Sequence, residues 1–171
     1  MKRTISSLFV VLGGLIVSAP VFAATSTANL GVSATVLTNC TISTTAVAFG
    51  NYDPVGLNTA TPAGDKSATG TVVVACTKGA TGLRIDLDNG VGLPAARRMQ
   101  GPGADILNYD LYVDAAHATR WGTGAAAGGG QTIANAPSKA ARTYNVYGLL
   151  PGAQDITAGV YGDTVIATIN Y

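Results

Sequence analysis

Short segments in which apolar and polar residues alternate recur along this chain, and they constrain its fold more than any other feature. In segment 83–88, leucine and isoleucine alternate with arginine and aspartate, and segment 106–114 repeats the pattern. A period of two residues is that of a half-buried β-strand. Every acidic residue is an aspartate, and lysine is scarce, so the residues that favour helix surfaces are largely missing. The sequence therefore predicts an all-β protein.

Turn signals set the expected number of strands. Glycine, proline, asparagine and aspartate separate strand-like segments at 41–49, 71–76, 83–88, 106–114, 143–150 and 159–171. Segments 57–70 and 89–103 are predicted to be loops, because their composition is that of turns and loops. Six or seven short strands with this spacing favour a β-sandwich of immunoglobulin type.

The first 23 residues have the three parts of a secretory signal peptide. A positive start is followed by an apolar run and then by small residues at the exit. Cleavage is expected after Ala23, with Ala24 as the close alternative; a retained signal anchor is the competing interpretation. The remaining chain, about 148 of the 171 residues, suits one exported domain.

The two cysteines, Cys40 and Cys76, are expected to form a disulfide, because an exported chain meets oxidising conditions. The chain-entropy model gives about 3–4 kcal/mol of stabilisation for closing such a loop. The alternatives are two free thiols or part of a metal site, which the single histidine and the absence of a CxxC motif disfavour.

Just behind the signal peptide, an apolar stripe runs through a segment where a loose chain end would be expected. Its members alternate with small or polar residues and are Leu30, Val32, Ala34 and Val36. The stripe has the period of a strand. It is either the first strand of its own domain or a strand that pairs with another molecule.

The sequence shows no clear catalytic or metal-binding site. His117 is the only histidine, and no G-x-S-x-G motif accompanies it, so a hydrolase triad is not expected. Asp86 and Asp88 precede an Asn-Gly turn, but the remaining ligands of a calcium loop are missing. They are interpreted as solvated aspartates on a strand face. A net charge of +1 gives no indication of nucleic acid or of an anionic membrane surface. The sequence predicts no enzyme, no cofactor and no metal.

Several motifs resemble the spore coat protein U domain family, which includes subunits of archaic chaperone–usher pili. In chain order they are NCTIS, FGNYDP, TVVVACTKG, LNYDLYVDAAHATRWGTG and YNVYGLLPGAQDITAGVYGDTVIATINY. Together they span nearly the whole expected mature chain, and the last two are long and specific. The alanine- and glycine-rich GAAAGGG departs from the family pattern.

The resemblance implies an incomplete immunoglobulin-like β-sandwich that is completed by a donor strand. Residues 24–37 would be the N-terminal donor-strand extension, and 38–171 the sandwich domain. A periplasmic chaperone would fill the open groove first, and the extension of the next subunit would replace it at an outer-membrane usher. The implied groove wall and chaperone contact is the C-terminal strand, with Val165, Ala167, Ile169 and Tyr171.

The leading hypothesis is therefore a pilus subunit at the cell surface that polymerises by donor-strand exchange and serves surface attachment and biofilm formation. One alternative is a secreted coat or matrix protein with a self-complete sandwich, for which the extension would be dispensable. Another is an adhesive tip subunit, although about 148 residues hold only one domain. An uncharacterised hydrolase is the most distant alternative.

Overall fold

The computed structural model describes residues 20, 22–91, 96–126 and 128–171. The chain divides into two units, Met1–Thr35 and Val36–Tyr171. In the first unit, residues 22–35 form neither helix nor strand, and their side chains are exposed. Most of the predicted signal peptide, residues 1–19 and 21, lies outside the described residues.

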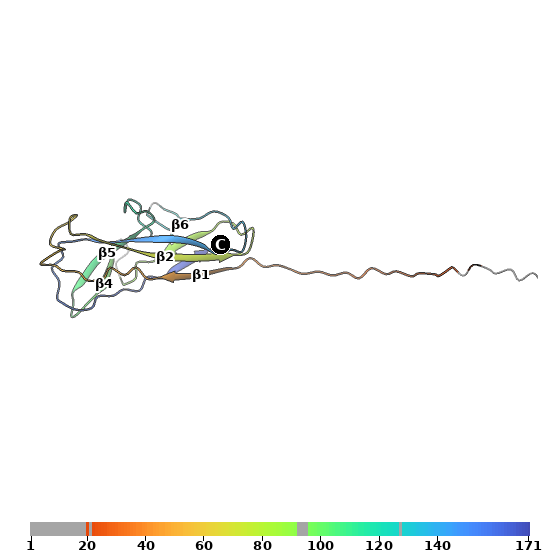
Figure 1. Ribbon diagram of the computed structural model, residues 1–171, viewed down its shortest axis with the longest axis horizontal. Coiled ribbons are helices and arrows are strands. Elements are labelled where there is room, and N and C mark those ends of the chain that lie inside the picture. Colours follow the sequence, from red (N-terminus) through yellow and green to blue (C-terminus); the bar gives the residue numbers. More distant parts are fainter. Residues whose placement is uncertain (1–19, 21, 92–95, 127) are drawn as a thin grey trace, which may run out of the picture. The chain divides into compact units, whose positions relative to one another are not determined.

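The second unit contains two antiparallel sheets (Figure 1). The five-stranded sheet has the order β1-β2-β7-β5-β4, and the three-stranded sheet has the order β6-β3-β8. The strands are β1 (Cys40–Thr45), β2 (Lys66–Cys76), β3 (Arg84–Leu87), β4 (Arg97–Gln100), β5 (Ile106–Tyr112), β6 (Gln131–Thr132), β7 (Arg142–Leu150) and β8 (Ala167–Asn170). The described residues include no helix, so the predicted all-β class is confirmed. Among them, no helical segment has the length and apolar character needed to cross a membrane.

The hydrophobic core lies between the two sheets and follows the alternation of the sequence. Leu83, Ile85 and Leu87 are buried, as their period predicts. Residues of β2, β5 and β7 pack against them from the five-stranded sheet. Trp121 is completely buried, and its indole Nε1 donates a hydrogen bond of 2.8 Å to the Ile85 carbonyl. The only tryptophan is therefore a core residue that links a loop to β3.

Several details of the sequence interpretation were wrong. The segments predicted as strands at 41–49 and 159–171 are strands only over Cys40–Thr45 and Ala167–Asn170. β2 begins at Lys66 and not near residue 71, because Lys66–Thr71 pairs with β7 despite its loop-like composition. β4 lies in the predicted loop 89–103. Its local sequence does not favour a strand, and the strand forms because it pairs with β5. Asp86 is buried and not solvated, because the Arg84 guanidinium (Nε–Oδ1, 2.8 Å) and the Asn170 amide (2.9 Å) donate to its carboxylate. The Arg84 hydrogen bonds hold the pKa of Asp86 below its usual value.

The predicted disulfide is confirmed. Cys40 and Cys76 are bonded and stand directly opposite each other in the β1–β2 pair. The bond closes a loop between positions separated by 36 residues and fastens the edge strand β1 to its neighbour β2. On the chain-entropy model, such a bond limits the conformations of the unfolded chain.

Candidate functional site

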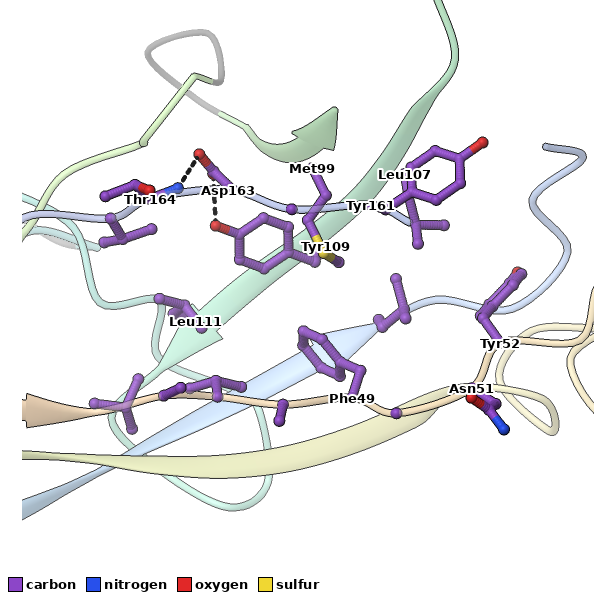
Figure 2. A pocket seen from close by; sticks show the side chains of 18 of the residues that line it. Phe49, Asn51, Tyr52, Met99, Leu107, Tyr109, Leu111, Tyr161, Asp163 and Thr164 are labelled. Atoms are coloured by element: carbon purple, nitrogen blue, oxygen red, sulfur yellow. Dashed lines mark hydrogen bonds between the residues drawn. The ribbon is translucent and has the colours of Figure 1, made fainter. Parts of the chain in front are cut away.

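An apolar groove of about 830 Å³ opens beside the core of the second unit (Figure 2). Residues 46–52, which follow β1, form its first wall, and residues 157–165, which lead into β8, form its second wall. The floor is the hydrophobic core itself, and it is lined by the side chains of Val72, Leu87, Leu107, Tyr109, Leu111, Val146 and Leu150. A sandwich whose core opens to one side in this way has room for another strand.

The first wall is extended but unpaired. Among the described residues, none from 46 to 52 forms a backbone–backbone hydrogen bond. Val47 and Phe49 are instead held by packing: both side chains lie over Gly148 of β7, and Val47 also lies over Gly70 of β2. The Phe49 ring meets the Tyr109 ring edge-on, with centroids 6.1 Å apart. The wall therefore depends on side-chain contacts, and its backbone groups are available to a partner.

Replacing Gly148 by alanine is expected to destabilise the domain by about 1–3 kcal/mol, the usual cost of overpacking. An added Cβ would lie 2.5 Å from Val47 Cγ1 and 2.8 Å from Phe49 Cζ, so the first wall would have to move. Urea unfolding measures the change. Gly162→Ala is the matched control, because a Cβ there meets nothing within 4 Å. Equal midpoints for the two variants would contradict the packing of the first wall.

The second wall is fixed by polar contacts. Asp163 accepts hydrogen bonds from the Tyr109 hydroxyl (2.7 Å) and the Val91 amide (3.0 Å), and Gly162 pairs with Gln100 through both backbone groups. Burial and the neighbouring Asp163 carboxylate raise the pKa of Tyr109, so the phenol stays protonated and donates. At the start of β8, the Ile166 amide donates to the Asp88 carboxylate at 2.8 Å.

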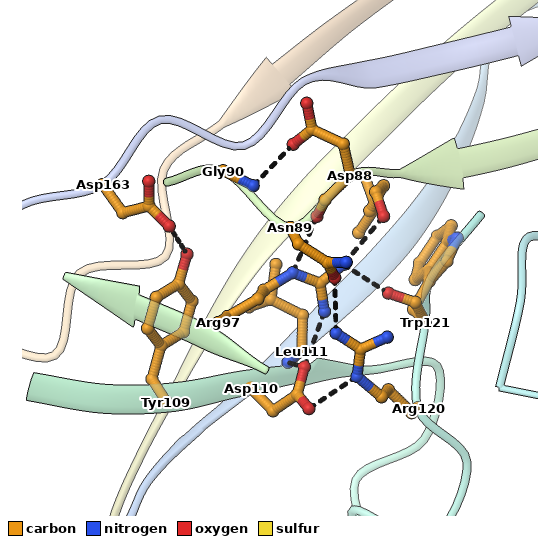
Figure 3. Close-up of polar contacts among 11 residues, drawn as sticks. Asp88, Asn89, Gly90, Arg97, Tyr109, Asp110, Leu111, Arg120, Trp121 and Asp163 are labelled. Carbon is orange, nitrogen blue, oxygen red and sulfur yellow. Dashed lines mark hydrogen bonds and ion pairs between the residues drawn. The ribbon is translucent and has the colours of Figure 1, made fainter. Parts of the chain in front are cut away.

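Arg97 connects the strands beneath this wall (Figure 3). Its side chain is 0% exposed. The guanidinium donates to the carbonyls of Leu87 (2.8 Å), Asp88 (2.8 Å) and Trp121 (2.6 Å), and it forms an ion pair with Asp110 at 2.6 Å. One cation therefore joins β4, the end of β3, the Trp121 loop and β5.

Sequence reasoning did not find this site for Arg97. Arg97 lies in segment 89–103, which the sequence predicts to be a loop, and two adjacent arginines give no sign of which one is buried. The only available signal was Asp110, which stands among apolar residues in the segment predicted as a strand.

The four expected groove-wall residues fall at different places. Val165 and Ala167 line the groove. Ile169 stands opposite Ile85 within the β8–β3 pair and packs against the core. Tyr171 follows the end of β8 and is exposed, with its hydroxyl 3.4 Å from Asn39 Oδ1. The structure thus brings two of the four to the groove.

The apolar stripe is exposed in the single chain, including the side chains of Leu30, Val32 and Val36. Behind it, Thr77 holds the chain just before β1. The Thr77 hydroxyl accepts from the Asn39 amide (3.1 Å) and donates to the Leu37 carbonyl (3.1 Å), and the Thr77 amide donates to the Asn39 carbonyl (2.8 Å).

Comparisons with known proteins agree with this architecture. The family model of the Spore Coat Protein U domain matches residues 26–168. "Protein U" of Myxococcus xanthus is 34% identical over 169 residues, which cover 92% of this chain and 91% of that protein.

A structural likeness is found in the chaperone–tip adhesion subunit pre-assembly complex CsuC–CsuE, from the archaic chaperone–usher Csu pili of Acinetobacter baumannii. The TM-score is 0.55 at 23% sequence identity, and the match covers 80% of this chain. This chain spans only 41% of the length of that chain, and the likeness shows the fold. On the family match over most of its length, the chain belongs to the Spore Coat Protein U domain family.

Proposed function

We propose that this protein is a structural subunit of a chaperone–usher type pilus, and that its subunits polymerise when the extension of one copy fills the groove of the next. The observation that carries the proposal is the coexistence, in one chain, of an open apolar groove and an exposed apolar stripe. The stripe, residues 30–36, and the first wall, residues 46–52, are both about 23 Å long as extended chain. The lengths therefore match.

We infer that the stripe fills the groove of a different molecule. Leu37 is hydrogen-bonded to Thr77, which follows β2 and lies about 17 Å along the chain from Val72, the nearest groove residue of β2. Ala34 and Val36 are at most three residues from Leu37, so they reach no farther than about 11 Å from it and fall short of the groove of their own chain. A contact that is satisfied only between copies, head to tail, produces a fibre.

The energetics favour such an exchange. Four apolar side chains that leave water contribute on the order of 4–8 kcal/mol, and the backbone hydrogen bonds to the unpaired wall add to this. Because the donor would form part of a core, its release requires the core to open, and dissociation would be slow. We infer that the protein is exported to the cell surface. A periplasmic chaperone would occupy the groove first, and the extension of the next subunit would replace it at an outer-membrane usher. The assembled pilus would serve surface attachment and biofilm formation.

A synthetic peptide of residues 24–37 tests the proposal. The acceptor is the full chain with Val32→Asp, which keeps its groove and has a disabled donor. The wild-type peptide is expected to raise the thermal midpoint of this acceptor, because a ligand of the folded state stabilises it. The same peptide with Val32→Asp serves as the control. If neither peptide shifts the midpoint, donor-strand exchange is not the assembly mechanism.

A second candidate is a coat or matrix protein, which the family description favours through its reference to a spore coat. In that case the extension would be dispensable, and removing it would leave assembly unchanged.

A further inference from the structure

Three apolar side chains project into solvent at one end of the groove. Val55 and Leu57 are 89% and 85% exposed, and Val160 is 90% exposed. We call these three residues the apolar rim. They flank the same end of the groove, because the adjoining residues Pro54 and Gly159 both line it. Asn51, Tyr52 and Tyr161 also lie toward this end in Figure 2.

The loop that carries Val55 and Leu57 is firmly held. The Asp53 carboxylate accepts hydrogen bonds from the Val55 amide (3.1 Å) and the Gly56 amide (2.9 Å). The side chain of Asn58 is buried; its oxygen accepts from the Asp53 amide (2.8 Å) and its nitrogen donates to the Gly64 carbonyl (2.6 Å). The backbone is thus fixed while the apolar side chains remain in water. Preorganised exposed apolar groups are typical of an interaction surface.

The direction of the donor strand determines which part of the next copy meets this rim. The second wall runs into β8, the edge strand of a sheet in which every pair is antiparallel. A strand added to that edge is expected to run antiparallel to the second wall, which is the commoner and more stable pairing. It would run parallel to the first wall, because the two walls run in opposite directions (Figure 2). It would enter beside Val165 and leave beside Gly159, because residues 157–165 run the opposite way. The end that leaves is the C-terminal end of the stripe, at Val36.

The residue after Val36 matches the rim in chemistry. Leu37 is apolar, is 76% exposed and lies on the face opposite to the stripe, so the groove does not use it. Its carbonyl is bound to Thr77, which places the donor's own domain directly behind it. An incoming copy would therefore bring Leu37 to the rim while its stripe occupies the groove.

We propose that the apolar rim is a second contact between successive subunits, in which Val55, Leu57 and Val160 of the acceptor receive Leu37 of the donor copy. This proposal rests on the proposed donor-strand exchange and adds to it a surface outside the groove. The occupant is a second copy of this chain. The contact would limit the rotation of one domain relative to the next, which a single inserted strand would permit.

Cysteine cross-linking in assembled fibres tests the contact. The full chain with Leu37→Cys and Leu57→Cys is expected to give a ladder of covalent multimers on oxidation, and the ladder should collapse on reduction. The matched control combines Leu37→Cys with Ala125→Cys, an exposed alanine in the loop between β5 and β6. The control pair should give at least tenfold less cross-linked product, and each single variant no ladder. Equal cross-linking of the two pairs, or none from the first, would overturn the proposal.

A second variant separates this inference from the proposed function. The acceptor with Val32→Asp, Val55→Ser and Leu57→Ser is expected to bind a peptide of residues 24–36 within twofold of the affinity of the Val32→Asp acceptor. Fibre yield from the chain that carries only the two serine substitutions should fall several-fold. If the peptide fails to bind either acceptor, donor-strand exchange itself is wrong. If it binds both and fibre yield is unchanged, only the rim contact is wrong.

Discussion

Replacing Val32 by aspartate is expected to abolish assembly while leaving the domain folded. The side chain of Val32 is exposed in the single chain, so the substitution has little effect on the folded monomer. In the groove of a neighbour, the carboxylate would be placed against an apolar floor, and none of the described residues that line the groove is a lysine or arginine. The cost of burying an unpaired charge is several kcal/mol. A loss of about 3–5 kcal/mol corresponds to a fall in affinity of roughly 10²-fold to several thousand-fold.

Ser33→Asp is the matched control, because adjacent residues of a strand point to opposite faces. The same charge one position along would remain in water and is expected to leave fibre yield within about twofold of wild type. Fibre yield is measured by sedimentation and electron microscopy. Equal yields for the two variants would show that the alternation of the stripe plays no part in assembly.

Arg97→Ala is expected to destabilise the domain by about 3–5 kcal/mol, the effect of breaking a buried ion pair by removing one partner. Asp110 would keep Arg120 as a partner, at 2.6 Å, so most of the loss would come from the three backbone carbonyls that Arg97 satisfies. The measurement is urea unfolding of the disulfide-intact chain.

The neighbouring residue supplies the control for Arg97. Arg98 is only partly buried and forms no ion pair among the described residues. Arg98→Ala should therefore change the free energy of unfolding by less than about 0.5 kcal/mol. If both variants unfold at the same urea concentration, the network around Arg97 does not hold the second wall in place.

Much of the fold could be predicted, because apolar and polar residues alternate clearly in several of the strands. β3 and β5 show this: Ile85, Leu87, Leu107, Tyr109 and Leu111 are all buried in the expected phase. β4 and the start of β2 were missed because they hold few large apolar residues, so they lack the alternation of the other strands. Their strand conformation comes from pairing with distant segments, which a local pattern does not contain.

The groove was harder to predict than the strands. Alternation identifies Val165 and Ala167 as facing inward, but it does not show that the core stays open beside them. The first wall could have been suspected from Gly70 and Gly148, two glycines inside predicted or actual strands, since glycine in a strand often marks a close approach. The depth of the groove depends on how segments far apart in sequence are placed, so it required the structure.

The measurement that tests the central claim most directly is the assembly state of the mature chain with and without residues 24–37. Both forms would be exported together with a chaperone of the chaperone–usher class and examined by size exclusion and electron microscopy. We expect fibres that resist SDS from the complete chain and a chaperone-bound monomer from the shortened one. A shortened chain that folds alone and assembles as well as the complete chain would contradict donor-strand exchange and favour a self-complete coat or matrix protein.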